Sequence, residues 1–217
     1  MLLTAILLTT KLALITTLIL LMIGIPLAWR LSVMKSRFRP VIEAVVGLPL
    51  VLPPTVLGFY LLVMFSPDNA LGNYWQEMTG STLAFSFSGL VLASVIYSLP
   101  FVVQPLQRAF EQMDHGLLEA AAMLGATPFD RFMNVVIPNS LRALLLAGCM
   151  GFAHTVGEFG VVLMIGGNIP GETQVLSIAL FDAVETQQFN EAHTIAGGLL
   201  LFSMVLLVAL YSIGQRK

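Results

Sequence analysis

His154 and Glu158 are the two residues whose types and spacing are best suited to chemistry. They lie four positions apart in an apolar stretch, so a helix places both on one face. A buried imidazole and carboxylate could relay protons or contact a polar solute in a pathway, and they could equally form a hydrogen bond that fixes helix packing. A metal site is the weakest alternative, because two ligands do not make a site.

Motifs for enzymatic chemistry are missing from the sequence. The nucleotide-binding pattern G-x-x-x-x-G-K-[ST] does not occur, because none of the three lysines, Lys11, Lys35 and Lys217, follows a glycine. The patterns C-x-x-C, H-E-x-x-H and G-x-S-x-G do not occur either, and Cys149 stands alone among small residues. We therefore expect a chain that is not an enzyme, holds no metal or cofactor, and draws its energy from elsewhere.

The composition places these residues in a membrane protein. Of the 217 residues, 57% are hydrophobic and 10% are charged, whereas about 25% of residues are charged in a typical soluble domain. A globule of this size could not bury so much apolar side chain, so the surplus must face membrane lipid. High hydrophobicity, one cysteine and a net charge of −2 exclude a disordered chain, a disulfide scaffold and a nucleic-acid-binding module.

Five apolar stretches are long enough to cross a bilayer as helices, which takes about 20 residues. They lack the alternating polarity of barrel strands. The sequence therefore predicts an all-α integral membrane protein, with one transmembrane domain over residues 1–217. The expected spans are residues 12–29, 41–65, 83–104, 141–165 and 194–214. The first is expected to be a retained span, because no charged region opens the chain as in a signal peptide.

The basic residues indicate the orientation of the spans. The two loops over residues 66–82 and 166–193 contain no Lys or Arg, and they hold six acidic residues. All the basic residues except Lys11 fall on the other side: Arg30, Lys35, Arg37, Arg39, Arg108, Arg131, Arg142, Arg216 and Lys217. Basic residues concentrate on the cytoplasmic side of membrane proteins. We therefore expect the N-terminus outside and the C-terminus in the cytoplasm.

The cytoplasmic segment over residues 105–140 is too polar to span the membrane and too patterned for a linker. Helix-forming residues 119–124 are followed by Gly125, a natural helix end. Thr127 can then cap a second short helix that has Pro128 as its first residue. Pro138 marks the approach to the fourth span.

This segment resembles the cytoplasmic loop of the membrane subunits of ABC importers, whose pattern is E-A-A-x-x-x-G-x(9)-I-x-L-P. The resemblance implies a type I ABC importer permease fold, with a coupling helix around residues 124–129 seated in a groove of a separate ATPase subunit, present in two copies. An ordinary amphipathic surface helix is the alternative. The expected coupling residues are Glu119, Ala120, Ala121, Leu124, Gly125, Ala126 and Pro138.

The second span carries a run of prolines at its centre. Proline removes a helix amide and clashes with the preceding turn, so we expect a kink or break at Pro53 and Pro54, with a helix restarting at Pro54. Free amides of Thr55, Val56 and Leu57 would then form a weak waypoint for an oxyanion. The alternative is a structural kink that only shapes the pathway or its gate.

Three further segments narrow the substrate: residues 48–58, 157–160 and 168–173, which read LPLVLPPTVLG, GEFG and NIPGET. Together they are similar to the permease subunits of molybdate importers, with sulfate importers as the nearest relatives. The resemblance implies import of molybdate, and of the similar tungstate, through a homodimer in a bacterial or archaeal inner membrane, with an extracytoplasmic molybdate-binding protein. The alternatives are a permease for sulfate or another oxyanion, and a self-contained channel or secondary carrier. The expected pathway or gate residues are Pro49, Pro53, Pro54, Thr55, Gly58, Thr155 and Glu158.

Two features remain open at this stage. Ala147, Gly151 and Thr155 recur every four residues and allow close helix approach, either within the chain or at a homodimer seam. Residues 173–186 have helical character and are a candidate outer gate or docking face.

Overall fold

The computed structural model describes residues 2–215, apart from the side chains of His115 and residues 213–215. Arg216 and Lys217, which entered the orientation prediction, lie outside the described residues. Within residues 2–215 the structure is helical and contains no strand, as predicted. The elements are α1 (Leu2–Val33), α2 (Arg39–Val51), α3 (Pro54–Phe65), α4 (Ala70–Thr79), α5 (Phe87–Glu111), α6 (His115–Met123), α7 (Pro128–Arg131), the π-helical turn η1 (Phe132–Val136), α8 (Ile137–Asn139), α9 (Leu141–Gly157), α10 (Gly160–Gly166), α11 (Leu176–Glu185) and α12 (Phe189–Gln215).

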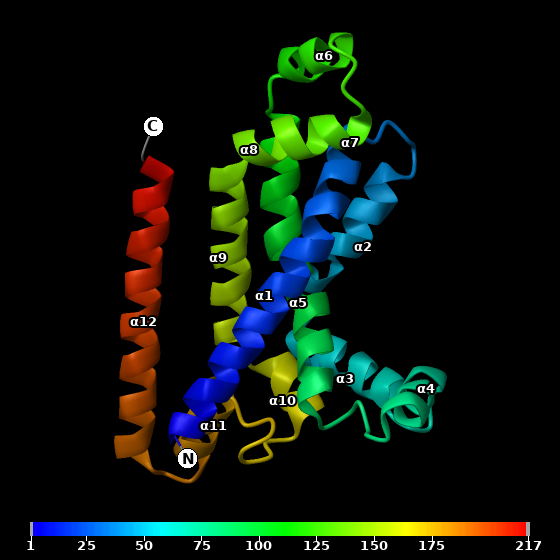
Figure 1. Cartoon of the computed structure of the whole chain (residues 1–217). Helices are drawn as coiled ribbons and strands as arrows, with labels where there is room; N and C mark the ends of the chain where they lie inside the picture. Colours follow the sequence, from blue (N-terminus) through cyan, green and yellow to red (C-terminus); the bar gives the residue numbers. More distant parts are fainter. Residues whose placement is uncertain (1, 216–217) are drawn as a thin grey trace.

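Three continuous helices, α1, α5 and α12, are long and apolar enough to cross a membrane (Figure 1). Two bent helix pairs bring the count to five when each pair is taken as one span. In the first pair α2 and α3 meet at 109°, and in the second the segment Pro128–Asn139 meets α9 at 75°. The predicted span 41–65 breaks between α2 and α3, as expected at Pro53 and Pro54. The predicted span 141–165 is also interrupted, between α9 and α10, where no break was predicted.

The break in the second span follows from its two adjacent prolines. A residue that precedes proline is disfavoured in the helical conformation. Leu52 precedes Pro53, and Pro53 precedes Pro54, and both have extended backbones, with ψ of 135° and 134°. The helix restarts with Pro54 as its first residue, as predicted.

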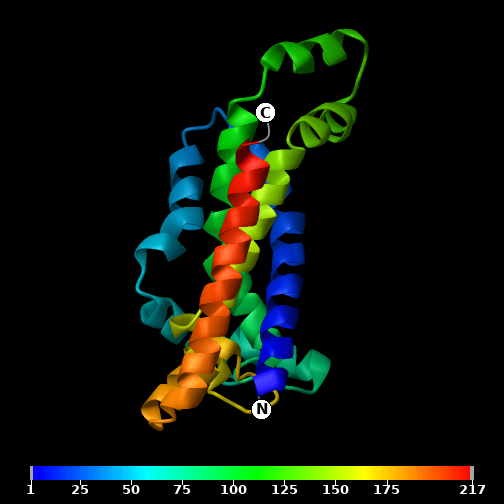
Figure 2. The ribbon, with the colours of Figure 1, turned by 90° about the vertical axis from the view of Figure 1, so that its left-hand side faces the viewer.

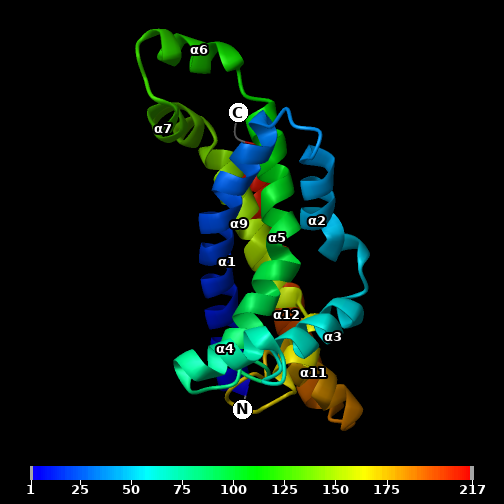
Figure 3. The same cartoon turned by 90° about the vertical axis from the view of Figure 1, so that its right-hand side faces the viewer.

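The core lies where α1, α5 and α9 pack against one another (Figure 3). Small residues let these helices approach closely, which is how membrane helices commonly associate. A Cβ atom at Gly24 of α1 would lie 3.0 Å from Val102 of α5, and one at Gly151 of α9 would lie 2.8 Å from the same valine. A side chain at Gly151 would therefore force Val102 to shift, and one at Gly24 would crowd the same valine.

The loop helices collect at the two ends of the bundle. Figure 1 shows α6, α7 and α8 at the end where α1 and α12 finish, and α4 and α11 at the opposite end, where α1 begins. Helix α12 runs beside α9 on the outside of the bundle (Figure 2), and most of its apolar side chains are exposed. An apolar helix so exposed within one chain is suited to contact lipid or another membrane helix.

Candidate coupling surface and buried polar cluster

Two short helices, α6 and α7, lie in the segment between α5 and α9, and the residues predicted to separate them do so. Gly125 has a φ of +84°, the left-handed conformation that favours glycine after a helix. Its amide donates to the carbonyl of Ala122 at 3.0 Å, and the amide of Ala126 donates to the carbonyl of Ala121 at 3.0 Å. These bonds satisfy the free carbonyls at the end of α6.

The start of α7 is a reciprocal capping box. The hydroxyl oxygen of Thr127 accepts from the amide of Asp130 at 3.2 Å, and the carboxylate of Asp130 accepts from the amide of Thr127 at 3.1 Å. Pro128 is the first helical residue, as predicted. Hydrogen bonds from the Thr127 hydroxyl, and then from its amide, hold the pKa of Asp130 below its ordinary value.

The junction between α6 and α7 carries an apolar tip formed by Met123, Leu124 and Phe129. Their exposed fractions are 90%, 89% and 70%, which is unusual for such large apolar side chains outside the membrane. The prediction of one helix around residues 124–129 is wrong, because Gly125 turns the chain and residues 124–127 are not helical. Met123 was not among the predicted residues, since it precedes the glycine in a segment of ordinary helix formers.

The other predicted coupling residues lie at the same end of the molecule. Glu119 and Ala120 are exposed on α6, Ala121 is half-buried there, and Ala126 is half-buried in the turn. Pro138 is exposed on α8, beyond the π-helical turn η1. This end therefore carries the predicted motif, and α6 is the helix that extends farthest from the bundle (Figures 1 and 2).

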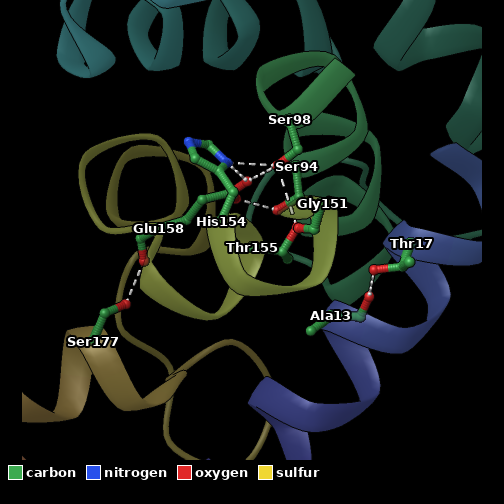
Figure 4. Close-up of polar contacts among 9 residues, drawn as sticks. All are labelled: Ala13, Thr17, Ser94, Ser98, Gly151, His154, Thr155, Glu158 and Ser177. Atoms are coloured by element: carbon green, nitrogen blue, oxygen red, sulfur yellow. Dashed lines mark hydrogen bonds and ion pairs between the residues drawn. The ribbon is translucent and has the colours of Figure 1, made fainter. Parts of the chain in front are cut away.

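A buried polar cluster joins α5 to the end of α9 (Figure 4). The carboxylate of Glu158 has no exposed side-chain surface, and it accepts hydrogen bonds from the hydroxyls of Ser94, at 2.5 Å, and Ser98. His154 Nδ1 lies 2.8 Å from the Ser98 hydroxyl and 3.4 Å from the Glu158 carboxylate. The hydroxyl of Ser98 also lies 3.2 Å from that of Thr155. Glu158 is thus held by groups from a neighbouring helix.

The arrangement favours the packing role among the alternatives for His154 and Glu158. The two side chains lie close together, but the prediction of one helical face is wrong, because α9 ends at Gly157 and Glu158 has an extended backbone. Ser98 stands between them as a common partner. The His154 ring also stacks on Phe101, with ring centroids 3.7 Å apart. Among residues 2–215, no group of three or more His, Cys, Asp or Glu side chains could hold a metal ion.

Ser94 and Ser98 are the members of the cluster that sequence reasoning missed. Their own spacing of four residues in an apolar span places both hydroxyls on one helical face, which is the signal that could have found them. The main chain at the break is also held, since the Ser177 hydroxyl donates to the Glu158 carbonyl at 2.5 Å. The cluster therefore fixes the point where α9 ends and α10 begins.

The two mid-span breaks meet, because α3 and α10 begin side by side. A Cβ atom at Gly160, the first residue of α10, would lie 2.8 Å from the Cβ of Pro54, the first residue of α3. One turn further on, a Cβ at Gly58 would lie 2.8 Å from the Cβ of Met164. Gly58 thus permits the contact, whereas Pro53, Pro54 and Thr55 are exposed at its edge.

The first turn of α3, which starts at Pro54, has fewer free amides to bind an anion than predicted. The amides of Val56 and Leu57 both donate to the carbonyl of Pro53, at 2.9 and 3.2 Å, so neither is free. The prediction of three free amides is therefore wrong, because the first turn of α3 closes on its own N-cap carbonyl. Thr55 is exposed at this turn.

Burial divides the predicted pathway residues into two groups. Pro49, Gly58, Thr155 and Glu158 are buried, so in this conformation they support the helix contacts rather than line an open passage.

Ala147, Gly151 and Thr155 pack within the chain, since all three are buried on α9 and Gly151 contacts α1 and α5. Their burial favours packing within one chain over a homodimer interface as the role of these three small residues.

A protein-family model covers residues 20–216 of the chain, and its description is "Binding-protein-dependent transport system inner membrane component". The chain belongs to this family. It is accordingly a multi-pass protein of the inner membrane, and the expectation of an ABC importer permease fold is confirmed.

Curated relatives give the same assignment. The chain is 55% identical to the molybdenum transport system permease protein ModB of Azotobacter vinelandii, over 98% of this chain and 94% of that protein. It is 34% identical to ModB of Haemophilus influenzae, over 85% and 79% of the two chains. It is also 34% identical to the probable sulfate transport system permease protein cysT of Nephroselmis olivacea, over 93% and 71%.

Solved structures show the same fold at low identity. A crystal structure of a bacterial ABC transporter involved in the import of the acidic polysaccharide alginate includes a chain that is 16% identical, with a TM-score of 0.78 over 99% of this chain and 79% of that one. A second, of the alginate transporter with its periplasmic protein, gives a TM-score of 0.76 at 15% identity, over 99% and 78%. These similarities concern the fold alone.

Proposed function

We propose that this chain is the membrane-spanning subunit of an ATP-driven importer that carries molybdate, and the similar tungstate, into the cell. The observation that carries the proposal is the 55% identity to Azotobacter ModB, which extends over nearly the whole of both chains. Relatives named for sulfate transport match at 34% identity or less, which makes sulfate the second candidate.

A separate ATPase subunit powers the transport, and the apolar tip is its docking element. The sequence has no nucleotide-binding lysine motif of its own. Met123, Leu124 and Phe129 project from the end of the bundle that we assign to the cytoplasm. Burial of large apolar side chains in a groove of the ATPase would stabilise the complex. Two ATPase copies dock on a homodimer of this chain.

An extracytoplasmic binding protein delivers the anion to the opposite end. The outer segments over residues 66–82 and 166–193 contain no Lys or Arg, so they repel a free dianion rather than concentrate it. Capture by a separate protein resolves this difficulty, because the anion then arrives already bound. The N-terminus lies on that outer side and the C-terminus lies in the cytoplasm.

The helix breaks provide the moving parts of the pathway. Closure of the ATPase dimer would pull the two apolar tips together, and α9 would transmit this movement to the start of α10, where Glu158 is fixed to α5. The contact between α10 and α3 then carries the movement to the exposed edge at Pro54 and Thr55. Thr55→Val and Pro54→Ala are each expected to slow uptake with assembly intact, and normal uptake in both would exclude a role for this edge.

Uptake by living cells tests the substrate. Cells with and without this chain are supplied with radiolabelled molybdate or radiolabelled sulfate, and a plasmid copy restores the chain. We expect loss of molybdate uptake alone, recovered by the plasmid. Loss of sulfate uptake alone would replace molybdate by sulfate in an unchanged importer, and unchanged uptake of both anions would contradict the proposed substrate class.

A further inference from the structure

A cavity of about 450 Å³ lies between the end of α1 and the helices α6 and α7. Two arginines line it, Arg30 from the last turn of α1 and Arg131 from α7, together with Trp29, Pro128 and Glu119. It lies behind the apolar tip, because Arg131 and Phe129 are two residues apart on a helix and so point to nearly opposite sides. The cavity and the apolar tip therefore lie on different sides of α7.

The two arginines are not neutralised within the chain. Among residues 2–215, neither guanidinium lies within 4.0 Å of a carboxylate, so Glu119 shares the cavity without pairing to them. The Nε atom of Arg131 is enclosed and has no hydrogen-bond partner. An enclosed donor without a partner is costly, and a bound acceptor would relieve that cost once the side chain turns to expose Nε to the cavity.

The position of the cavity indicates what the acceptor is. Arg30 closes the long apolar helix α1, so its guanidinium lies at the level where hydrocarbon gives way to headgroups. Trp29 stands beside it, and tryptophan is enriched at this level of a membrane. Basic pockets on the cytoplasmic side of membrane proteins accept lipid phosphates, and a planar guanidinium binds phosphate through paired hydrogen bonds.

We propose that Arg30 and Arg131 bind the phosphate group of an anionic membrane lipid in this cavity. The lipid headgroup joins α1 to α7 and so holds the base of the apolar tip against the bundle. Glu119 weakens the site by repelling the phosphate, which keeps the lipid exchangeable. The site is independent of which anion the importer carries.

Native mass spectrometry of the purified full-length chain tests this proposal. The chain is titrated with phosphatidylglycerol, with zwitterionic phosphatidylcholine and with inorganic phosphate in separate arms. We expect preferential binding of phosphatidylglycerol, about tenfold weaker in Arg30→Gln and in Arg131→Gln. Glu119→Gln should bind it more tightly. Arg142→Gln is the matched control, because Arg142 lies at the same end but lines a different cavity.

The arms separate the two sources of phosphate. Competition by millimolar inorganic phosphate, without selective binding of phosphatidylglycerol, would assign the cavity to free phosphate instead of lipid. Equal binding in wild type, Arg30→Gln and Arg142→Gln would overturn the proposal. Arg30→Gln alters an exposed side chain at a helix end, so this result is interpretable even when Arg131→Gln fails to fold.

Discussion

The hydroxyl of Ser94 donates a 2.5 Å hydrogen bond to the carboxylate of Glu158, across 64 positions of sequence (Figure 4). This bond connects the first half of α5 to the point where α9 ends. A carboxylate buried in a membrane protein is costly unless hydrogen bonds satisfy it. The hydrogen bonds of the cluster thus offset the cost of burying the Glu158 carboxylate, and they fix its position between α5 and the end of α9.

Removal of the serine hydroxyls should destabilise the joint. Ser94→Ala and Ser98→Ala each leave the Glu158 carboxylate short of a donor, at a cost of about 1–3 kcal/mol. The measurement is the thermal unfolding of the purified complex. Ser203→Ala is the control, because that hydroxyl is exposed on α12 and donates only to its own helix. Equal losses of thermal stability in all three variants would mean that the hydroxyls of the cluster stabilise the protein no more than an exposed serine does.

A side chain at Gly58 should separate α3 from α10. Gly58→Ala places a Cβ 2.8 Å from the Cβ of Met164, which is not the flexible end of that side chain. Overpacking of this kind costs about 1–3 kcal/mol, and we expect slower anion uptake at equal expression. Gly197→Ala is the matched control, because a Cβ there meets no atom within 4 Å and Gly197 is exposed on α12. Uptake that is equal in the two variants would contradict the role of the α3–α10 contact.

A charge on the apolar tip should release the ATPase. Leu124 is 89% exposed, so Leu124→Asp leaves the chain itself stable but places a carboxylate in an apolar groove. Co-purification with the ATPase should fall by about tenfold or more. Met78→Asp makes a similar change at a 69% exposed side chain on the opposite end of the molecule and should leave co-purification intact. Retention of the ATPase by Leu124→Asp would place the docking site elsewhere.

The capping box predicts a specific pH behaviour. The pKa of Asp130 is lowered by the Thr127 hydroxyl and amide, so the box stabilises α7 at neutral pH and loses its contribution only as the pH falls through this lowered pKa. Thr127→Val should return the pKa of Asp130 toward its ordinary value of 3.8. Carboxyl-carbon NMR of chains labelled at aspartate measures this, with Asp130→Asn to assign the signal. An unchanged titration would show that the box does not form in solution.

The sequence alone was enough to predict those helix ends and breaks that depend on a few neighbouring residues. The adjacent prolines at positions 53 and 54 disfavour helical backbone at the residue before each of them, and Leu52 and Pro53 are extended here. Gly125 and Thr127 end and begin helices by their own chemistry. For the same reason the capping pattern could be predicted to the residue. The apolar stretches also predicted five spans from length and hydropathy. The structure has three continuous helices of this kind, and five only when each of two bent helix pairs is taken as one span.

Features that depend on packing between distant segments could not be read in this way. No proline in the sequence predicts the break after Gly157. This break is stabilised by hydrogen bonds from Ser94, Ser98 and Ser177, which lie on other helices. The engaged amides of Val56 and Leu57 depend on how the first turn of α3 closes. Exposure of Met123 depends on the direction in which α6 leaves the bundle, which only the assembled fold determines.

We propose that this chain moves molybdate only when a separate ATPase drives it. The most direct test reconstitutes the purified chain in vesicles, with and without the ATPase, the binding protein and ATP, and follows the entry of radiolabelled molybdate. We predict uptake with the complete set and none when the ATPase or ATP is omitted. Molybdate uptake by vesicles that contain this chain alone would contradict the account and identify the protein as a self-contained carrier or channel.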